Sequence, residues 1–131
     1  MSLDDIAGLK TLVAAALDAA EAQPGIFSGV ERDRALAQAA DVAARGHKGP
    51  LAGMILAHKD MYDRAGQVTG MGAHPSAGYT ADTTCTVLQR LDDAGQVDIG
   101  RLRMSEFAMG PTGHNAHWGV APNACVPGAV P

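Results

Sequence analysis

Two alanine-rich amphipathic segments in the first third of the chain constrain the fold more than any other feature. In residues 3–22, apolar residues recur at helical spacing: Ile6, Leu9, Val13, Leu17 and Ala20. After Ser28, a second helical face is predicted to be buried: Ala35, Leu36, Ala39, Ala40 and Ala43. Aromatic residues make up only 4% of the chain, although 47% of it is apolar. The helices must therefore pack closely around a core of small side chains.

Residues that favour helix ends bracket both segments. Ser2 and Asp5 resemble a capping box at the start of the first helix, and Pro24-Gly25 ends that helix near residue 22. A clearer capping box, Ser28 to Glu31, is predicted to open the second helix. Gly46, directly after Arg45, is predicted to end it.

The first strand is predicted from Met54 to His58. Its consecutive apolar residues indicate burial on both faces, as in a parallel sheet. A second, short strand is predicted at Val97–Ile99. In the Gly-rich stretch from Gly66 to Gly78, Val68 and Met71 are the expected strand-like positions.

A third helix is predicted to open at Thr80 and to end at Gly95. We expect Val87, Leu88 and Leu91 on its inner face, and Cys85 to pack on the same apolar side. A helical turn is expected between Met104 and Met109, and the chain from Gly110 onward is expected to be irregular.

The predicted elements therefore alternate between helices and strands within 131 residues, which suits one domain. We expect an α/β chain: a truncated, mixed α/β layer fold with helices packed on a small, partly parallel sheet. Within this single domain, residues 1–131, an extra amino-terminal helix is expected in residues 1–27.

Charge and hydropathy exclude several kinds of partner. The formal charge is −4 and the pI is about 5.6, without a basic stripe, which argues against nucleic-acid binding. No window approaches the roughly 20 apolar residues of a membrane span, and the first 22 residues are too acidic for a signal peptide. We therefore expect a cytoplasmic protein in which Cys85 and Cys125 are free thiols; a single disulfide is the alternative.

Lys59 is the first candidate for chemistry. It follows the apolar run at the expected carboxyl end of a strand, where α/β proteins usually place their sites. Partial burial would favour the neutral amine, which can accept a proton near neutral pH. The alternative is a solvated lysine that only marks the end of the strand.

Two further patterns carry weaker chemical hypotheses. Ser105 could act as a nucleophile beside a lysine base, although such a serine usually caps a helix. His114 and His117 are three residues apart and could bind a metal if they shared a helical turn. The Gly and Asn residues around them favour a loop instead, so we expect no metal and no other cofactor.

Two long segments resemble the amidase signature family. The segment "GPLAGMILAHKDMYDRAG", residues 49–66, is similar to the family pattern "GPLxGIPxxVKDNxDxxG". The segment "MSEFAMGPTGHNAHWGVAPNACVPGAVP", residues 104–131, is similar to the "MSEFAxGxTGxNxHxGxxxNPxxPxxxP" segment that follows in those enzymes. The resemblance covers nearly the whole chain from about residue 28, so residues 28–131 are expected to form the family-like part.

The resemblance implies a role for Lys59 and a missing partner for it. These enzymes use a lysine base, a bridging serine in a cis peptide and a serine nucleophile. The base corresponds to Lys59, whereas both serines lie in a Gly-Ser-rich segment that would begin at about Pro131. The expected function is therefore a truncated amidase-like hydrolase of amide or ester bonds, with weak or no activity alone.

Several positions depart from the family pattern. Residues 100–103 read Gly-Arg-Leu-Arg where the family has Gly-Lys-Thr-Asn, and Met61 replaces an asparagine. These changes favour an alternative without catalysis, in which the chain self-associates or binds a complementary chain. Such binding would cover the strand edges and apolar faces that a truncated sheet exposes.

Overall fold

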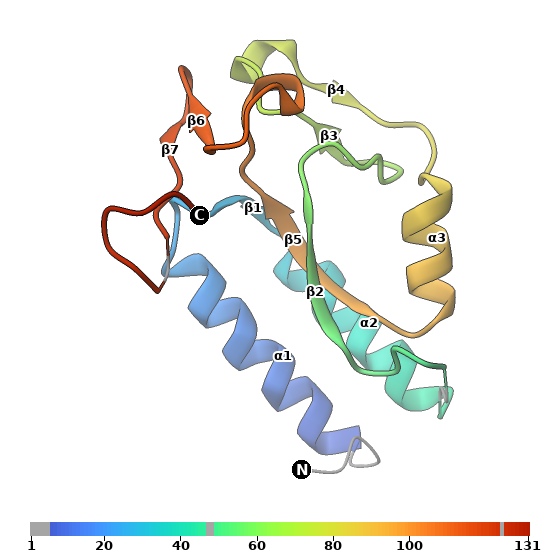
Figure 1. Cartoon of the computed structure of the whole chain (residues 1–131). Helices are drawn as coiled ribbons and strands as arrows, with labels where there is room; N and C mark the ends of the chain where they lie inside the picture. The colour runs from blue at the N-terminus through green and yellow to red at the C-terminus, as the bar shows by residue number, and fades with distance from the viewer. Residues whose placement is uncertain (1–5, 47–48, 124) are drawn as a thin grey trace.

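The computed structural model of the chain describes residues 6–46, 49–123 and 125–131. In chain order, its elements are α1 (Ile6–Glu21), β1 (Phe27–Val30), α2 (Arg32–Ala44), β2 (Ile55–Lys59), β3 (Val68–Thr69), η1 (Pro75–Ala77), β4 (Tyr79–Thr80), α3 (Thr86–Asp93), β5 (Val97–Leu102), η2 (Glu106–Ala108), β6 (His114–Asn115) and β7 (Gly119–Val120). The mixed α/β layer fold with a small, partly parallel sheet is confirmed (Figure 1).

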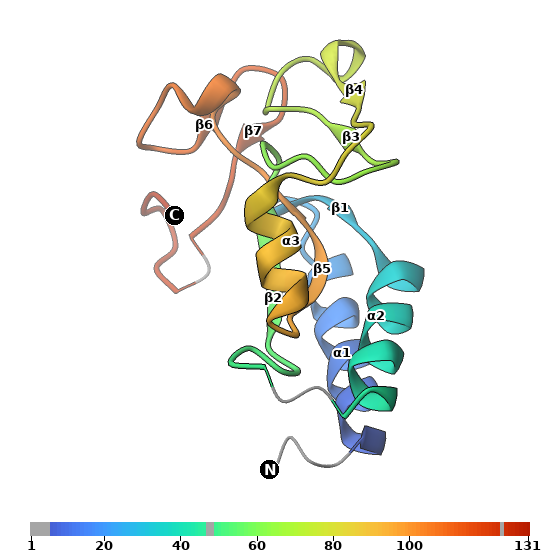
Figure 2. The same cartoon turned by 90° about the vertical axis from the view of Figure 1, so that its right-hand side faces the viewer.

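The main sheet has the strand order β1-β5-β2. β5 pairs in parallel with β2 and antiparallel with β1. α1 and α2 lie side by side against this sheet, and α3 lies on the opposite side of β2 and β5 from α1 (Figures 1 and 2). Two short hairpins, β3-β4 and β6-β7, stand beyond the carboxyl ends of β2 and β5.

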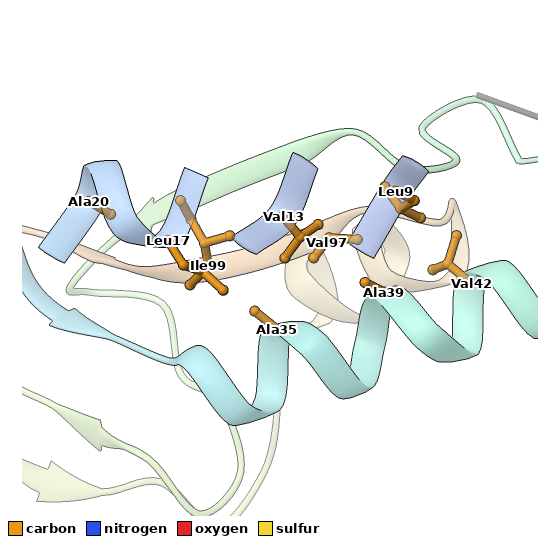
Figure 3. Packing of buried hydrophobic residues seen from close by; sticks show 9 residues of the cluster. All are labelled: Leu9, Val13, Leu17, Ala20, Ala35, Ala39, Val42, Val97 and Ile99. Carbon is orange, nitrogen blue, oxygen red and sulfur yellow. The ribbon is translucent and has the colours of Figure 1, made fainter. Parts of the chain in front are cut away.

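The helical core follows the predicted spacing. Figure 3 shows α1 and α2 meeting β5 through nine buried residues: Leu9, Val13, Leu17, Ala20, Ala35, Ala39, Val42, Val97 and Ile99. The alanines of α2 bring that helix close to α1. The expected cap at Ser2 and Asp5 lies outside the described residues, as does the side chain of Ile6.

The predicted start of the second helix is wrong. α2 begins at Arg32, and Ser28 lies in β1, a strand that the sequence analysis did not predict. The Ser28 hydroxyl donates to the Arg101 carbonyl, 3.4 Å away, in the neighbouring strand. Ser28 therefore supports the sheet rather than a helix cap.

The predicted burial of the first parallel strand on both faces is wrong. The apolar strand β2 is an edge strand, and its residues Ile55 to His58 are only half-buried. The more polar β5 is central, and its residues Val97 to Arg101 are all buried. A strand can be buried with charged residues in it when those charges are paired, as Asp98 and Arg101 are.

The region between Gly66 and Gly95 also departs from the predicted elements. α3 begins at Thr86, whereas Thr80 lies in β4. Cys85 directly precedes α3 and is half-buried, so it does not lie on the apolar face of that helix as expected. Leu88 is fully buried, but Val87 is 44% exposed.

Two other local predictions fail as well. Val68 is in β3, but Met71 has a left-handed backbone with φ of 54° and belongs to no strand. The segment after Gly110 was expected to be irregular, yet it contains the β6-β7 hairpin.

Cys85 and Cys125 are both free thiols, as expected. No helix in the described ranges is long and apolar enough to cross a membrane.

Candidate functional site

Lys59 ends β2 at the carboxyl edge of the parallel β2-β5 pair. It lies opposite Leu102 in the register, and its side chain reaches the surface. The Nζ atom donates a hydrogen bond to the Arg103 carbonyl, 2.9 Å away. Lys59 is exposed, so the expected partial burial is wrong. The chain that leaves β5 holds its amine in one direction.

Two cavities flank Lys59. One, of about 280 Å³, is lined by Ile26, Arg103 and Pro122 among others. The second, of about 300 Å³, is lined by the segment that follows β5, including Ser105. Lys59 and Pro131 line both cavities. Lys59 therefore stands between two hollows, and the last residue of the sequence lies in the wall of each.

Ser105 shares a cavity with Lys59, but its hydroxyl is already engaged. Its side chain is 7% exposed, and Oγ donates to the Gly110 carbonyl, 3.1 Å away. Ser105 does lie directly before η2, at the capping position, but its side chain makes no capping hydrogen bond there. The hydroxyl closes the 105–110 loop instead of capping the helix.

Arg103 braces the wall around Lys59, a role that the sequence analysis missed. Its Nη1 donates to the Trp118 carbonyl at 2.7 Å, and its Nε donates to the Phe27 carbonyl at 3.3 Å. The guanidinium also lies 5.2 Å from the centre of the Trp118 ring, in cation–π range. The Arg103 side chain thus connects β1 to Trp118, and the backbone carbonyl of the same residue accepts the hydrogen bond from Lys59. The departure from the family pattern at residues 100–103 was the only sign of it.

The predicted histidines do not meet in a shared metal site. His114 Nδ1 lies 3.0 Å from the Thr112 hydroxyl, whereas His117 Nε2 lies 3.3 Å from a carboxylate oxygen of Glu106. The His117 ring contacts His74 edge-on, with 5.4 Å between ring centres. Within residues 6–46, 49–123 and 125–131, no three His, Cys, Asp or Glu side chains form a group that could hold a metal ion.

Asp60, next to Lys59, is partly buried. Burial raises the pKa of its carboxyl above the usual range, while the hydrogen bond from the Gly70 N–H acts in the opposite direction. Asp60 lines a third cavity, of about 420 Å³, which does not include Lys59. The two neighbouring residues at the end of β2 therefore face different hollows.

A model of the amidase family matches residues 11–131 of the chain. A glutamyl-tRNA(Gln) amidotransferase subunit from Bordetella petrii is 42% identical over 127 residues, which cover 93% of this chain and 25% of that protein. The corresponding protein from Aromatoleum aromaticum is 39% identical over 118 residues, covering 88% of this chain and 24% of that protein. The chain thus spans about a quarter of the length of these curated relatives.

Two solved structures also match this chain over part of their own length. A structure described as a vestigial protein complex, which reveals the evolutionary origins of an s-triazine catabolic enzyme, matches with a TM-score of 0.79 and 31% identity, over 98% of this chain and 28% of that one. A crystal structure of an amidase matches with a TM-score of 0.74 and 27% identity, over 91% of this chain and 29% of that chain.

Proposed function

Because this chain belongs to the amidase signature family, we propose that it supplies the lysine-bearing part of an amide-hydrolysing site, whose hydroxyl nucleophile lies outside residues 1–131. The observation that carries this proposal is the setting of Lys59. Its amine stands between two cavities whose walls both include Pro131. A segment that continued from Pro131, or that docked against it, would begin beside the lysine.

Lys59 would act as the general base. Once the segment that completes the site buries Lys59, its neutral amine takes the proton of the incoming hydroxyl, and the hydroxyl oxygen attacks the carbonyl carbon of the amide. The ammonium that results returns this proton to the leaving nitrogen when the C–N bond breaks. Water then repeats the sequence on the ester intermediate and releases the acid. The Arg103 carbonyl, which accepts from Nζ, would keep the amine oriented during these transfers.

Ser105 is the alternative nucleophile within the chain. It lines the same cavity as Lys59, which supports the idea. Its hydroxyl, however, is buried and already donates to Gly110, so it would have to break this hydrogen bond before it could react. We therefore place the nucleophile in a following segment or in a complementary chain.

A second candidate function is that of a binding module without catalysis. It is favoured by the apolar side chains left exposed near the Lys59 cavities: Met109 is 86%, Phe107 56% and Met61 40% exposed. A partner chain or a second copy of this chain would cover them. Similarity to one component of an amidotransferase and to a chain of a vestigial complex supports a protein partner.

Hydrolysis of a chromogenic ester and of the matching anilide separates the two functions. Because the chain is proposed to lack the nucleophile, we expect it to hydrolyse the ester slowly and the anilide not at all. Together with a segment that supplies the Gly-Ser-rich stretch, it should hydrolyse both. If the completed assembly forms but hydrolyses neither compound, the binding module is the correct function. Turnover of the anilide by the chain alone would show that the nucleophile is inside it.

A further inference from the structure

Asp60 is the centre of a set of contacts at the end of β2. Its Oδ1 accepts a hydrogen bond from the Gly70 N–H at 3.1 Å. Its backbone carbonyl accepts from the Met71 N–H at 2.7 Å. A Cβ atom on Gly70 would lie 2.6 Å from Asp60 Oδ2, so the glycine is what allows this close approach. Residue 60 therefore holds two consecutive amides of the 70–72 loop.

The 70–72 loop in turn holds the turn that follows Ser105. The Met71 carbonyl accepts the Phe107 N–H at 2.8 Å. Three residues have positive φ angles: Met71 at 54°, Phe107 at 50° and Ala108 at 60°. Residues other than glycine rarely adopt this left-handed backbone conformation. Such conformations persist only where surrounding contacts impose them. The hydrogen bond between Met71 and Phe107 joins two of the three.

Asn115 fastens the same loop from the other side. Its Nδ2 donates to the Gly72 carbonyl at 2.6 Å and to the Met104 carbonyl at 2.9 Å. The two segments are too close at residue 72 for a side chain, because a Cβ on Gly72 would lie 2.8 Å from the Met104 carbonyl oxygen. A shift of the 70–72 loop should therefore also move residues 104–108.

The 104–110 segment is a wall of the Lys59 site. Met104, Ser105, Ala108 and Gly110 all line the 300 Å³ cavity that Lys59 also lines. The path from Asp60 through Met71 to Phe107 thus leads back to the cavity of the neighbouring lysine. Asp60 itself faces the separate 420 Å³ cavity, so it acts on this wall through the loop rather than by contact.

We propose that Asp60 is a positioning residue, which sets the left-handed 107–108 turn in the wall of the Lys59 cavity by clamping the 70–72 loop. This inference rests on the proposed function, because the shape of that wall matters to hydrolysis only if the cavity takes part in it. The clamp itself is a property of the chain and is measurable without any activity.

The first test is amide hydrogen exchange of the whole chain, followed residue by residue by NMR. Asp60→Ala removes the acceptor of the Gly70 N–H and keeps the backbone bond from Met71, so it tests the carboxylate alone. We expect the Phe107 amide to exchange about tenfold faster or more, although it does not touch Asp60. Asp60→Asn keeps an acceptor oxygen at the same place. It should restore Phe107 exchange to within about threefold of the wild type.

Asp63→Ala is the matched control. The Asp63 carboxylate holds the β3-β4 hairpin, since Oδ1 accepts from Thr69 Oγ1 at 2.7 Å and from the Tyr79 hydroxyl at 2.8 Å. Its loss should accelerate exchange in that hairpin and leave Phe107 unchanged. Unchanged Phe107 exchange in Asp60→Ala, or equal acceleration in Asp63→Ala, would overturn the inference.

Turnover by the completed assembly gives a second readout. Because the reacting groups would be misplaced rather than removed, Asp60→Ala should lower kcat by about tenfold and change KM less, with recovery in Asp60→Asn. Asp60→Ala with normal kcat and accelerated Phe107 exchange would overturn the catalytic part of the inference. If turnover does not depend on Lys59, the proposed function fails, whatever the exchange of Phe107 shows.

Discussion

Replacement of Lys59 by alanine is expected to lower ester turnover by about 10²–10⁴-fold in any preparation in which this chain is active. In the proposed mechanism, this substitution removes the group that takes the proton from the nucleophile. Lys59→Arg is the sharper variant. A guanidinium can still donate to the Arg103 carbonyl, but it remains protonated near neutral pH and cannot act as a base. We therefore expect Lys59→Arg to be as inactive as Lys59→Ala.

The control for this prediction is the exposed Lys10 of α1, which lines neither of the two cavities beside Lys59. Lys10→Ala should keep wild-type turnover in the same assay of initial rates. Wild-type turnover in Lys59→Arg would mean that residue 59 supplies only a positive charge or a hydrogen bond. Wild-type turnover in Lys59→Ala would remove the residue from the mechanism altogether.

Replacement of Asp98 by alanine is expected to lower the free energy of unfolding by about 3–5 kcal/mol. Asp98 is fully buried in β5, and three guanidinium groups converge on its Oδ2 atom. The distances are 2.9 Å from Arg64 Nη2, 3.1 Å from Arg34 Nη2 and 3.4 Å from Arg101 Nη1. Without the carboxylate, Arg64 would keep its ion pair with Asp92 at 2.7 Å, whereas Arg34 and Arg101 would lose their charged partner in a buried environment.

Urea denaturation followed by circular dichroism measures this effect. The matched control is Asp41→Ala, because Asp41 also pairs with an arginine, Arg45, at 2.6 Å, but both side chains are more than half exposed. An exposed pair of this kind contributes less than about 1 kcal/mol, so the control should unfold near the wild-type midpoint. Similar midpoints for Asp98→Ala and Asp41→Ala would contradict the assigned role of the buried cluster.

The same cluster explains why the sheet was harder to predict than the helices. The spacing of Leu9, Val13 and Leu17 reports burial directly, because one face of a helix recurs in the sequence. In β5, by contrast, Asp98 and Arg101 look like solvent-facing residues. Their burial depends on Arg34 and Arg64, which come from distant parts of the chain. Ion pairs between remote residues leave no local pattern to detect.

Some features of the candidate site could also be predicted from the sequence, whereas others could not. Lys59 could be singled out in advance, because its motif is local and resembles that of a known family. The structure adds that Lys59 and Ser105 share a cavity, which their wide separation in the sequence concealed. The bracing role of Arg103 and the clamp formed by Asp60 depend on backbone carbonyls and amides. Nearly every residue carries both groups, so the residue type alone does not predict such contacts.

Covalent labelling tests the central claim most directly, namely that Lys59 serves a nucleophile from outside residues 1–131. The completed assembly would be treated with a fluorophosphonate that reacts with activated serines, and the labelled peptides would be identified by mass spectrometry. We predict a label on the segment that completes the site, loss of this label in Lys59→Ala, and no label on residues 1–131. A stoichiometric, Lys59-dependent label on Ser105, or on any other serine of this chain, would contradict the account.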